Sequence, residues 1–137
     1  MEFTIHPVLP AHDINRAAHW YRDKLGLEPV KHGGEPISPG AHPERYEEEL
    51  MYDTGTARWN VYESAHAGHN RATAARLVTP DFDAVFGELK SRGVVFEEYD
   101  FGDDFRTVDG VLVSPDGEKT CWFKDSEGNI LALGSSD

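Results

Sequence analysis

Apolar residues recur at helical spacing near the start of the chain. Their positions follow the i, i+3, i+4, i+7 and i+11 pattern of one helix face, and they are Ile14, Ala17, Ala18, Tyr21 and Leu25. Asp13 precedes the first of them, and its carboxylate can accept hydrogen bonds from the free N–H groups that begin a helix. Gly26 follows the last and favours termination. The pattern predicts a half-buried helix over residues 14–25.

A second stretch repeats this pattern in the other half of the chain. Its apolar positions, at i, i+3, i+4 and i+7, are Phe82, Val85, Phe86 and Leu89. Thr79 is the predicted N-cap, Pro80 suits the first helical position, and Gly93 marks the end. We therefore predict a second half-buried helix between positions 79 and 93.

Short apolar stretches bounded by turn residues flank both helices in the same order. The predicted strands of the first half are residues 3–9 before the helix and 27–31, 49–52 and 58–63 after it. Those of the second half are residues 73–78 before the helix and 94–99, 119–124 and 130–133 after it. Each half therefore has the order βαβββ. Asp13 and Asp81 lie about half a chain length apart, so an internal duplication explains the repeat.

This order predicts an α+β protein with one domain, residues 1–137. It consists of two tandem βαβββ modules, at about residues 1–66 and 67–137. One helix covers only one face of a four-stranded sheet. The two modules are therefore expected to form a curved mixed sheet whose other faces surround a cavity.

Two segments do not fit the strand pattern. Residues 32–48 are rich in glycine and proline, which predicts a long loop without regular structure. This loop is either a lid over the cavity or a surface excursion with no role. Residues 100–110 contain the acidic residues Asp100, Asp103, Asp104 and Asp109. Their spacing does not match an EF-hand, so we expect a solvated turn rather than a calcium site.

Charge and composition limit the classes of partner. The chain has 13 basic and 25 acidic residues, and its net charge of −12 would repel nucleic-acid phosphates. No apolar run approaches the roughly 18 residues that span a bilayer, and the first residues lack a signal-peptide pattern. We expect no nucleic-acid or membrane partner and a cytoplasmic location. The single Cys121 cannot form an intrachain disulfide and is expected to lie in the core.

Three motifs resemble a known family. They are DINRAAHWYRDKLGL at residues 13–27, LKSRGVVFEEY at 89–99 and WFKDSEGNIL at 122–131. The first and last resemble the first helix and the last hairpin of the vicinal oxygen chelate superfamily, also called the glyoxalase/bleomycin resistance protein/dioxygenase superfamily. The likeness covers nearly the whole chain except residues 32–48. It implies the glyoxalase/bleomycin resistance fold, and it suggests a homodimer.

The resemblance also implies where a metal site would lie. Metal-dependent members carry one ligand, usually His or Glu, on each of the first, fourth, fifth and eighth strands. These positions fall here on His6, on Asn60 or Tyr62, on Ala75 and on Ala132. One imidazole cannot hold a catalytic transition metal in the usual three- or four-ligand arrangement. We therefore expect no metal cofactor, and a divalent metal held by other ligands is the less favoured hypothesis.

Replacement ligands could come from two linker histidines, His66 and His69, or from His12, His19, His32 and His42. No cysteine or further histidine lies at the spacing of a zinc finger around the linker pair. We therefore expect an exposed pair rather than a structural zinc site.

Aromatic and hydrogen-bonding residues on the predicted strands favour a binding site for a flat organic molecule. The predicted ligand-binding residues are His6, Tyr52, Trp59, Asn60, Tyr62 and Trp122. No nucleophile-elbow, phosphate-loop or dinucleotide-binding motif is found. The first hypothesis is metal-free binding of an aromatic or antibiotic-like molecule. The second hypothesis is a lyase, isomerase or dioxygenase that uses non-family metal ligands or His6 as a base. The third hypothesis is a structural dimer whose aromatic residues fill the cavity.

Overall fold

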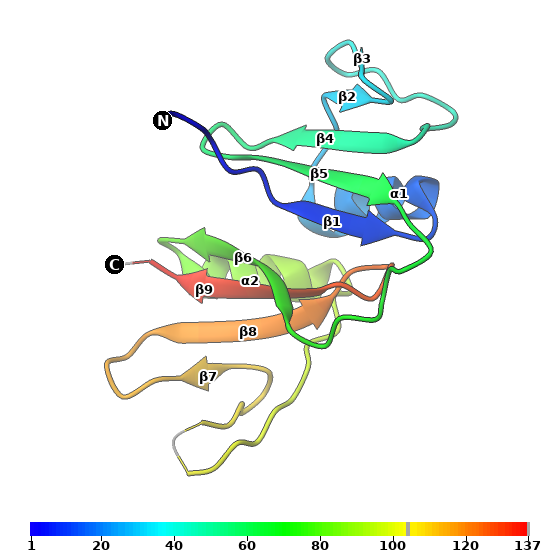
Figure 1. Ribbon diagram of the computed structural model, residues 1–137. Coiled ribbons are helices and arrows are strands. Elements are labelled where there is room, and N and C mark those ends of the chain that lie inside the picture. Colours follow the sequence, from blue (N-terminus) through cyan, green and yellow to red (C-terminus); the bar gives the residue numbers. More distant parts are fainter. Residues whose placement is uncertain (104, 137) are drawn as a thin grey trace. The chain divides into compact units, whose positions relative to one another are not determined.

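The computed structural model describes residues 1–103 and 105–136, so Asp104 of the acidic segment lies outside the described residues (Figure 1). The chain divides into two compact units. The first unit comprises Met1–His69 with Ser126–Asn129, and the second comprises Asn70–Asp125 with the residues from Ile130 on. Each unit has one long helix and one mixed sheet, which confirms the predicted α+β class.

The first unit begins with a helix that has the predicted bounds. Helix α1 spans Ile14–Leu25, and the Asp13 carboxylate accepts hydrogen bonds from the N–H groups of Asn15 and Arg16, each at 3.0 Å. Gly26 ends the helix in the left-handed region, with φ 68°. A residue with a side chain would adopt this conformation at a cost, which explains the glycine.

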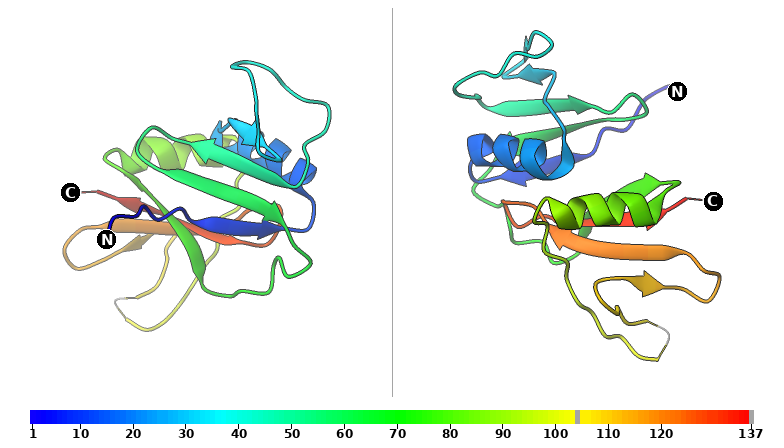
Figure 2. Two further views of the ribbon diagram at one scale, coloured as in Figure 1. Left: turned by 45° about the horizontal axis from the view of Figure 1, so that its top comes forward. Right: turned by 180° about the vertical axis from the view of Figure 1, so that it is seen from behind.

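The sheet of the first unit has the strand order β1-β5-β4-β2-β3. Its strands are β1 (Val8–Ala11), β2 (Lys31–His32), β3 (Glu35–Pro36), β4 (Glu49–Asp53) and β5 (Arg58–Glu63). The β1–β5 pair is parallel and the other pairs are antiparallel. Helix α1 lies across one face of this sheet (Figure 2). Leu50, Tyr52 and Val61 are buried with Tyr21 of that helix, because strand alternation sends them to the same face.

Three predictions for this unit need correction. The strand predicted at residues 27–31 shares only residue 31 with β2, which is Lys31–His32. The first strand begins at Val8 rather than at residue 3, and the segment expected to be an irregular loop contains a short hairpin. Gly33 and Gly34 form its two-residue turn with φ of 53° and 80°. Two successive positive φ values are what a type I′ hairpin turn requires. The Gly-Gly pair was therefore a hairpin signal within the glycine- and proline-rich composition.

The end of the same segment is fixed to α1. Asn15 donates from Nδ2 to the Tyr46 carbonyl at 3.2 Å, and the Tyr46 N–H donates to Asn15 Oδ1 at 2.6 Å. Arg22 donates to the Tyr46 hydroxyl at 2.9 Å, and the Tyr46 residue is buried. This end of the segment 32–48 therefore packs against α1.

The turn Ser126–Asn129, from the third family-like motif, also belongs to the first unit. The Glu127 carboxylate accepts hydrogen bonds from the Asp13 N–H at 2.9 Å and from Arg16 at 2.8 and 2.9 Å. The Ser126 hydroxyl donates to the same carboxylate at 2.7 Å. The two motifs that carry the resemblance therefore meet at one buried acidic side chain.

The second unit has the strand order β6-β9-β8-β7. Its elements are β6 (Thr73–Thr79), α2 (Phe82–Ser91), β7 (Leu112–Val113), β8 (Lys119–Lys124) and β9 (Ile130–Ser135). The N-cap of α2 is Asp81 and not Thr79, because the Asp81 carboxylate accepts from the Ala84 N–H at 3.4 Å. Thr79 is the last residue of β6, and its hydroxyl accepts from the Asp81 N–H.

Residues 94–99 are not a strand of this sheet, although the sequence predicts one. Phe96 forms an isolated bridge to Phe123, and the chain then leaves β8 because Tyr99 exchanges hydrogen bonds with Thr107. The strand β7 was not predicted.

The core of the second unit lies between α2 and one face of its sheet. Phe86 and Phe96 have ring centroids 4.5 Å apart, and Phe96 contacts Phe123 edge to face at 6.0 Å. Cys121 is fully buried, as predicted, and burial raises the pKa of its thiol to about 12. Such a thiol stays protonated at neutral pH and packs as a small apolar group. No helix of the described residues is long and apolar enough to cross a membrane.

Candidate functional site

Strand alternation divides the side chains of the second sheet between two faces. Cys121 and Phe123 point toward α2, so Trp122 between them points to the opposite face. Residues Ala132 of β9 and Arg76 of β6 lie in register with Trp122 across the sheet. We call this surface, on the side of β6, β9 and β8 away from α2, the open face of the second unit.

Aromatic rings gather on this open face. The rings of Tyr99 and Trp122 meet edge to face with centroids 5.5 Å apart, and Phe101 stacks on Tyr99 at 5.6 Å. Trp122 and Tyr99 are half-buried, and Phe101 is 72% exposed. Partial burial, helped by the nearby negative charge of Glu97, raises the pKa of Tyr99, so its hydroxyl stays protonated at neutral pH and can donate a hydrogen bond.

Arg76 extends along the same face toward Gly134. A Cβ atom built on Gly134 would lie 2.4 to 2.8 Å from the Nη2, Nε and Cζ atoms of the Arg76 guanidinium. The guanidinium therefore occupies the space that a side chain at position 134 would need. Ala132, the residue in register with Arg76, is buried and small, so the surface between Arg76 and Trp122 is flat.

The first sheet also has a face turned away from its helix, and it carries polar residues. Asn60 Nδ2 donates to Glu49 Oε1 at 2.8 Å, and Arg58 Nε lies 3.1 Å from Asp53 Oδ2. Tyr62 is on the same face and 39% exposed. Asn60 Oδ1 is buried and accepts no hydrogen bond within the part of the chain that the structure describes.

Tyr52 and Trp59, which the sequence predicts as ligand contacts, lie on the α1 side instead. Their rings stack with centroids 4.5 Å apart, and both contact Tyr21 of the helix. Burial raises the pKa of Tyr52 strongly. These two residues pack the core of the first unit, because their strand positions alternate with those of Met51 and Asn60. We therefore assign them to packing rather than to ligand binding.

His6 lies outside the strand on which it was predicted. It is exposed, two residues before β1 begins, with Nε2 3.5 Å from the Thr4 hydroxyl. An exposed imidazole lacks the apolar surroundings that the predicted role as a general base assumed.

The strand register puts Ala75, the implied fifth-strand metal position, and its neighbour Arg76 on opposite faces of the sheet. Ala75 lies beside Leu131, whose side chain is buried on the α2 side, and Arg76 lies beside Ala132. Arg76 therefore shares the open face with Ala132, the implied eighth-strand position, whereas Ala75 does not.

The residues at the implied positions do not fit a transition metal. A guanidinium donates and carries positive charge, and alanine has no donor atom, so Arg76 and Ala132 cannot ligate a cation. Within residues 1–103 and 105–136, no group of three or more His, Cys, Asp or Glu side chains could hold a metal ion. His66 and His69 are both exposed, as predicted.

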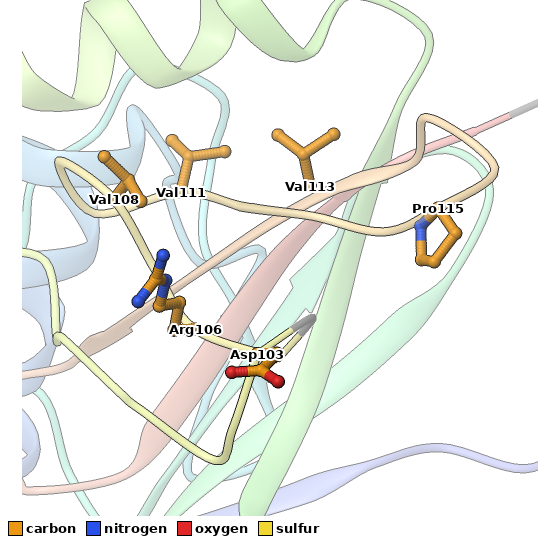
Figure 3. Close-up of a pocket in the computed structure, with 6 residues that line it drawn as sticks. All are labelled: Asp103, Arg106, Val108, Val111, Val113 and Pro115. Carbon is orange, nitrogen blue, oxygen red and sulfur yellow. The ribbon is translucent and has the colours of Figure 1, made fainter.

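A separate pocket of about 440 Å³ lies near the acidic segment of the second unit (Figure 3). Its walls come from residues before β7, from β7 and from the turn that follows, and they are Asp103, Arg106, Val108, Val111, Val113 and Pro115. None of the predicted ligand-binding residues lines this pocket.

Trp122, a ligand contact predicted from the sequence, lies on the open face, together with Arg76 and Tyr99, which were not predicted. Arg76 is the one charged residue in a strand of otherwise uncharged residues, a signal that was readable. Tyr99 lies at the end of a predicted strand, and its position beside Trp122 depends on how the chain leaves β8.

Comparisons with known proteins give the family and the fold. The model of the family described as Glyoxalase/Bleomycin resistance protein/Dioxygenase superfamily matches residues 4–133. Among curated protein sequences, none matches this chain.

Three solved structures illustrate the structural likeness. A glyoxalase/bleomycin resistance protein from Catenulispora acidiphila DSM 44928 has a TM-score of 0.67 at 21% identity, over 99% of this chain and 100% of that one. A bleomycin-binding protein complexed with bleomycin has a TM-score of 0.67 at 17% identity, again over 99% and 100%. A lactoylglutathione lyase from Agrobacterium tumefaciens has a TM-score of 0.65 at 15% identity, over 99% and 95%. At such identities the likeness shows a common fold, which both a binding protein and an enzyme adopt.

Proposed function

Because the chain belongs to the Glyoxalase/Bleomycin resistance protein/Dioxygenase superfamily, we propose that it binds a small aromatic organic molecule on the open face of the second unit, without a metal ion. The observation that carries this proposal is the partly exposed ring cluster of Trp122, Tyr99 and Phe101. A bleomycin-binding protein with the same fold gives a precedent for small-molecule binding.

The cluster offers a flat ligand two kinds of favourable contact. Covering the half-buried Trp122 ring removes apolar surface from water, at about 25 cal/mol per Å². A stacked or edge-to-face ring adds about 0.5–1.5 kcal/mol beyond that burial. The Tyr99 hydroxyl can donate one hydrogen bond, which would orient the ligand.

The metal-free part of the proposal follows from donor chemistry. The guanidinium of Arg76 beside Ala132 would repel a divalent cation on this face. No observation favours the alternative of catalysis by His6, since that imidazole is exposed and lies before β1.

Thermal unfolding tests the proposal. The protein, first dialysed against a chelator, is heated with each member of a panel of aromatic compounds and, separately, with Ni, Zn, Mn and Fe(II). We expect at least one aromatic compound to raise the Tm, because a ligand that binds only the folded state stabilises it. We expect the metals to leave the Tm unchanged.

Two variants locate the effect. Trp122→Ala should abolish the shift caused by the stabilising compound, whereas Phe3→Ala, at a ring that is 72% exposed in the first unit, should preserve it. A stoichiometric metal that raises the Tm would contradict the metal-free proposal. An undiminished shift in Trp122→Ala would contradict the location.

A further inference from the structure

From the placement of Arg76 we infer that the ligand is an aromatic carboxylate, with its carboxylate held by the Arg76 guanidinium and its ring lying over Ala132 against Trp122. This inference rests on the proposed function and names the chemical class of the ligand. All of the residues involved belong to the second unit.

The position of the guanidinium is set by a glycine. Its Nη2, Nε and Cζ atoms lie within 2.8 Å of the point where a Cβ of residue 134 would be. Gly134 is buried, and its place in β9 does not require a positive φ. Position 134 is therefore a glycine because the Arg76 guanidinium occupies the space of a side chain, and not because the backbone turns there.

Arg76 has its hydrogen-bonding capacity free. Within residues 1–103 and 105–136, no carboxylate lies at ion-pair distance from the Arg76 guanidinium and no group accepts a hydrogen bond from it. By contrast, Arg58 on the sheet of the first unit is paired with Asp53 at 3.1 Å. A guanidinium presents a planar fork of N–H donors that matches a carboxylate in geometry and charge.

The spacing across the sheet fits a molecule of this class. Arg76, Ala132 and Trp122 are in register on three adjacent strands. Neighbouring strands are about 4.8 Å apart and alternate residues about 7 Å apart along a strand, so the guanidinium over Gly134 lies about 8 Å along the sheet from the backbone of Trp122. A fused pair of aromatic rings with one carboxylate has about this length, and Ala132 leaves the space between flat.

The carboxylate of Glu97, near Trp122, does not compete with the carboxylate of the ligand for the Arg76 guanidinium. Glu97, the carboxylate beside this end of the face, lies 3.5 Å from Lys124 Nζ. The charge of Glu97 is therefore balanced by Lys124, while the positive charge at the opposite end of the face is Arg76. This polarity orients a ligand with its carboxylate toward the Arg76 guanidinium beside Gly134.

Paired probes test the inference. The affinities of 2-naphthoate and of its uncharged analogue 2-naphthamide are measured at pH 7 by isothermal titration calorimetry. We expect 2-naphthoate to bind about tenfold or more tightly than 2-naphthamide, since a hydrogen bond to a charged group has this magnitude. Arg76→Gln should remove the preference by weakening only 2-naphthoate.

Two further variants separate a specific contact from general effects. Arg58→Gln makes the same change of net charge on the other sheet and should leave the preference intact. Gly134→Ala keeps the charge of Arg76 but displaces its guanidinium, so it should weaken 2-naphthoate as Arg76→Gln does. Circular dichroism of each variant checks that it is folded.

The outcomes distinguish the two proposals. Equal binding of both probes, unchanged by Arg76→Gln, would overturn the carboxylate while leaving an aromatic ligand in place. Binding of neither probe would overturn this inference, whereas the proposed function fails only if the whole panel of aromatic compounds leaves the Tm unchanged. A preference that Arg58→Gln removes equally would also overturn it.

Discussion

Glu127 is a buried carboxylate whose stability contribution depends on charge. Burial opposes its ionisation, but hydrogen bonds from Arg16, Ser126 and the Asp13 N–H outweigh burial and lower its pKa. A carboxylate with a lowered pKa stabilises the folded state above its ordinary value of 4.5, and this stabilisation is lost as the pH falls through the folded-state pKa.

Replacing this carboxylate should therefore have a pH-dependent cost. We expect Glu127→Gln to lower the free energy of unfolding at pH 7 by about 1–3 kcal/mol, the range for hydrogen bonds to charged groups. The difference from the wild type should shrink below about pH 4. Urea unfolding at pH 7 and pH 3 measures it.

The matched control is Glu88→Gln. Glu88 pairs with Arg92 on the surface of α2, with 61% of its side chain exposed, so its loss should change stability by less than about 0.5 kcal/mol. A cost of Glu127→Gln that is equal at both pH values would show that packing, rather than the ion pair, explains it.

At the scale of elements, long periodic segments were predictable and short ones were not. Helix α1 and strands β5 and β8 have the predicted bounds, because each has a complete apolar pattern and clear turn residues at its ends. Strands β2, β3 and β7 have two residues each, too few to show an alternation. Their positions depend on pairing with distant strands.

The candidate site shows the same limit. The sequence placed Trp122 among the ligand-binding residues, and the structure puts it on the open face. The sequence also predicts Tyr52 and Trp59 as ligand contacts, but they pack against α1. Alternation alone does not say which of the two sheet faces a helix covers. The sequence did not point to Arg76, because its place on the open face depends on the pairing of β6 with β9.

The hydrogen bonds between α1 and Tyr46 allow a prediction for the segment 32–48. Asn15→Ala removes two hydrogen bonds to the backbone of Tyr46, so the end of this segment should detach from the helix more often. We expect the amide of Tyr46 to exchange with solvent about tenfold faster, with α1 itself unchanged. Hydrogen–deuterium exchange measures both.

Asn70→Ala is the control for this prediction. Among the described residues, its side chain accepts a hydrogen bond from the nearby Ala72 N–H and makes no other, so exchange near Tyr46 should stay as in the wild type. Unchanged exchange at Tyr46 in Asn15→Ala would mean that the segment is held by Arg22 and apolar packing instead.

For the whole molecule, the superfamily and the fold restrict the possible functions but do not identify one. Similar folds occur in a bleomycin-binding protein and in a lactoylglutathione lyase. The residues on the sheet faces must therefore decide, and here they are aromatic rings and an arginine rather than metal ligands. The homodimer and the cytoplasmic location stay predictions.

We propose above all that the open face of the second unit binds the ligand. Its most direct test is a titration of the ¹⁵N-labelled protein with 2-naphthoate, followed by heteronuclear NMR. We expect saturable chemical-shift changes at the Trp122 indole N–H and at the amides of Arg76, Ala132 and Gly134. Shifts confined to the pocket of Asp103 to Pro115, or to the first unit, would contradict it.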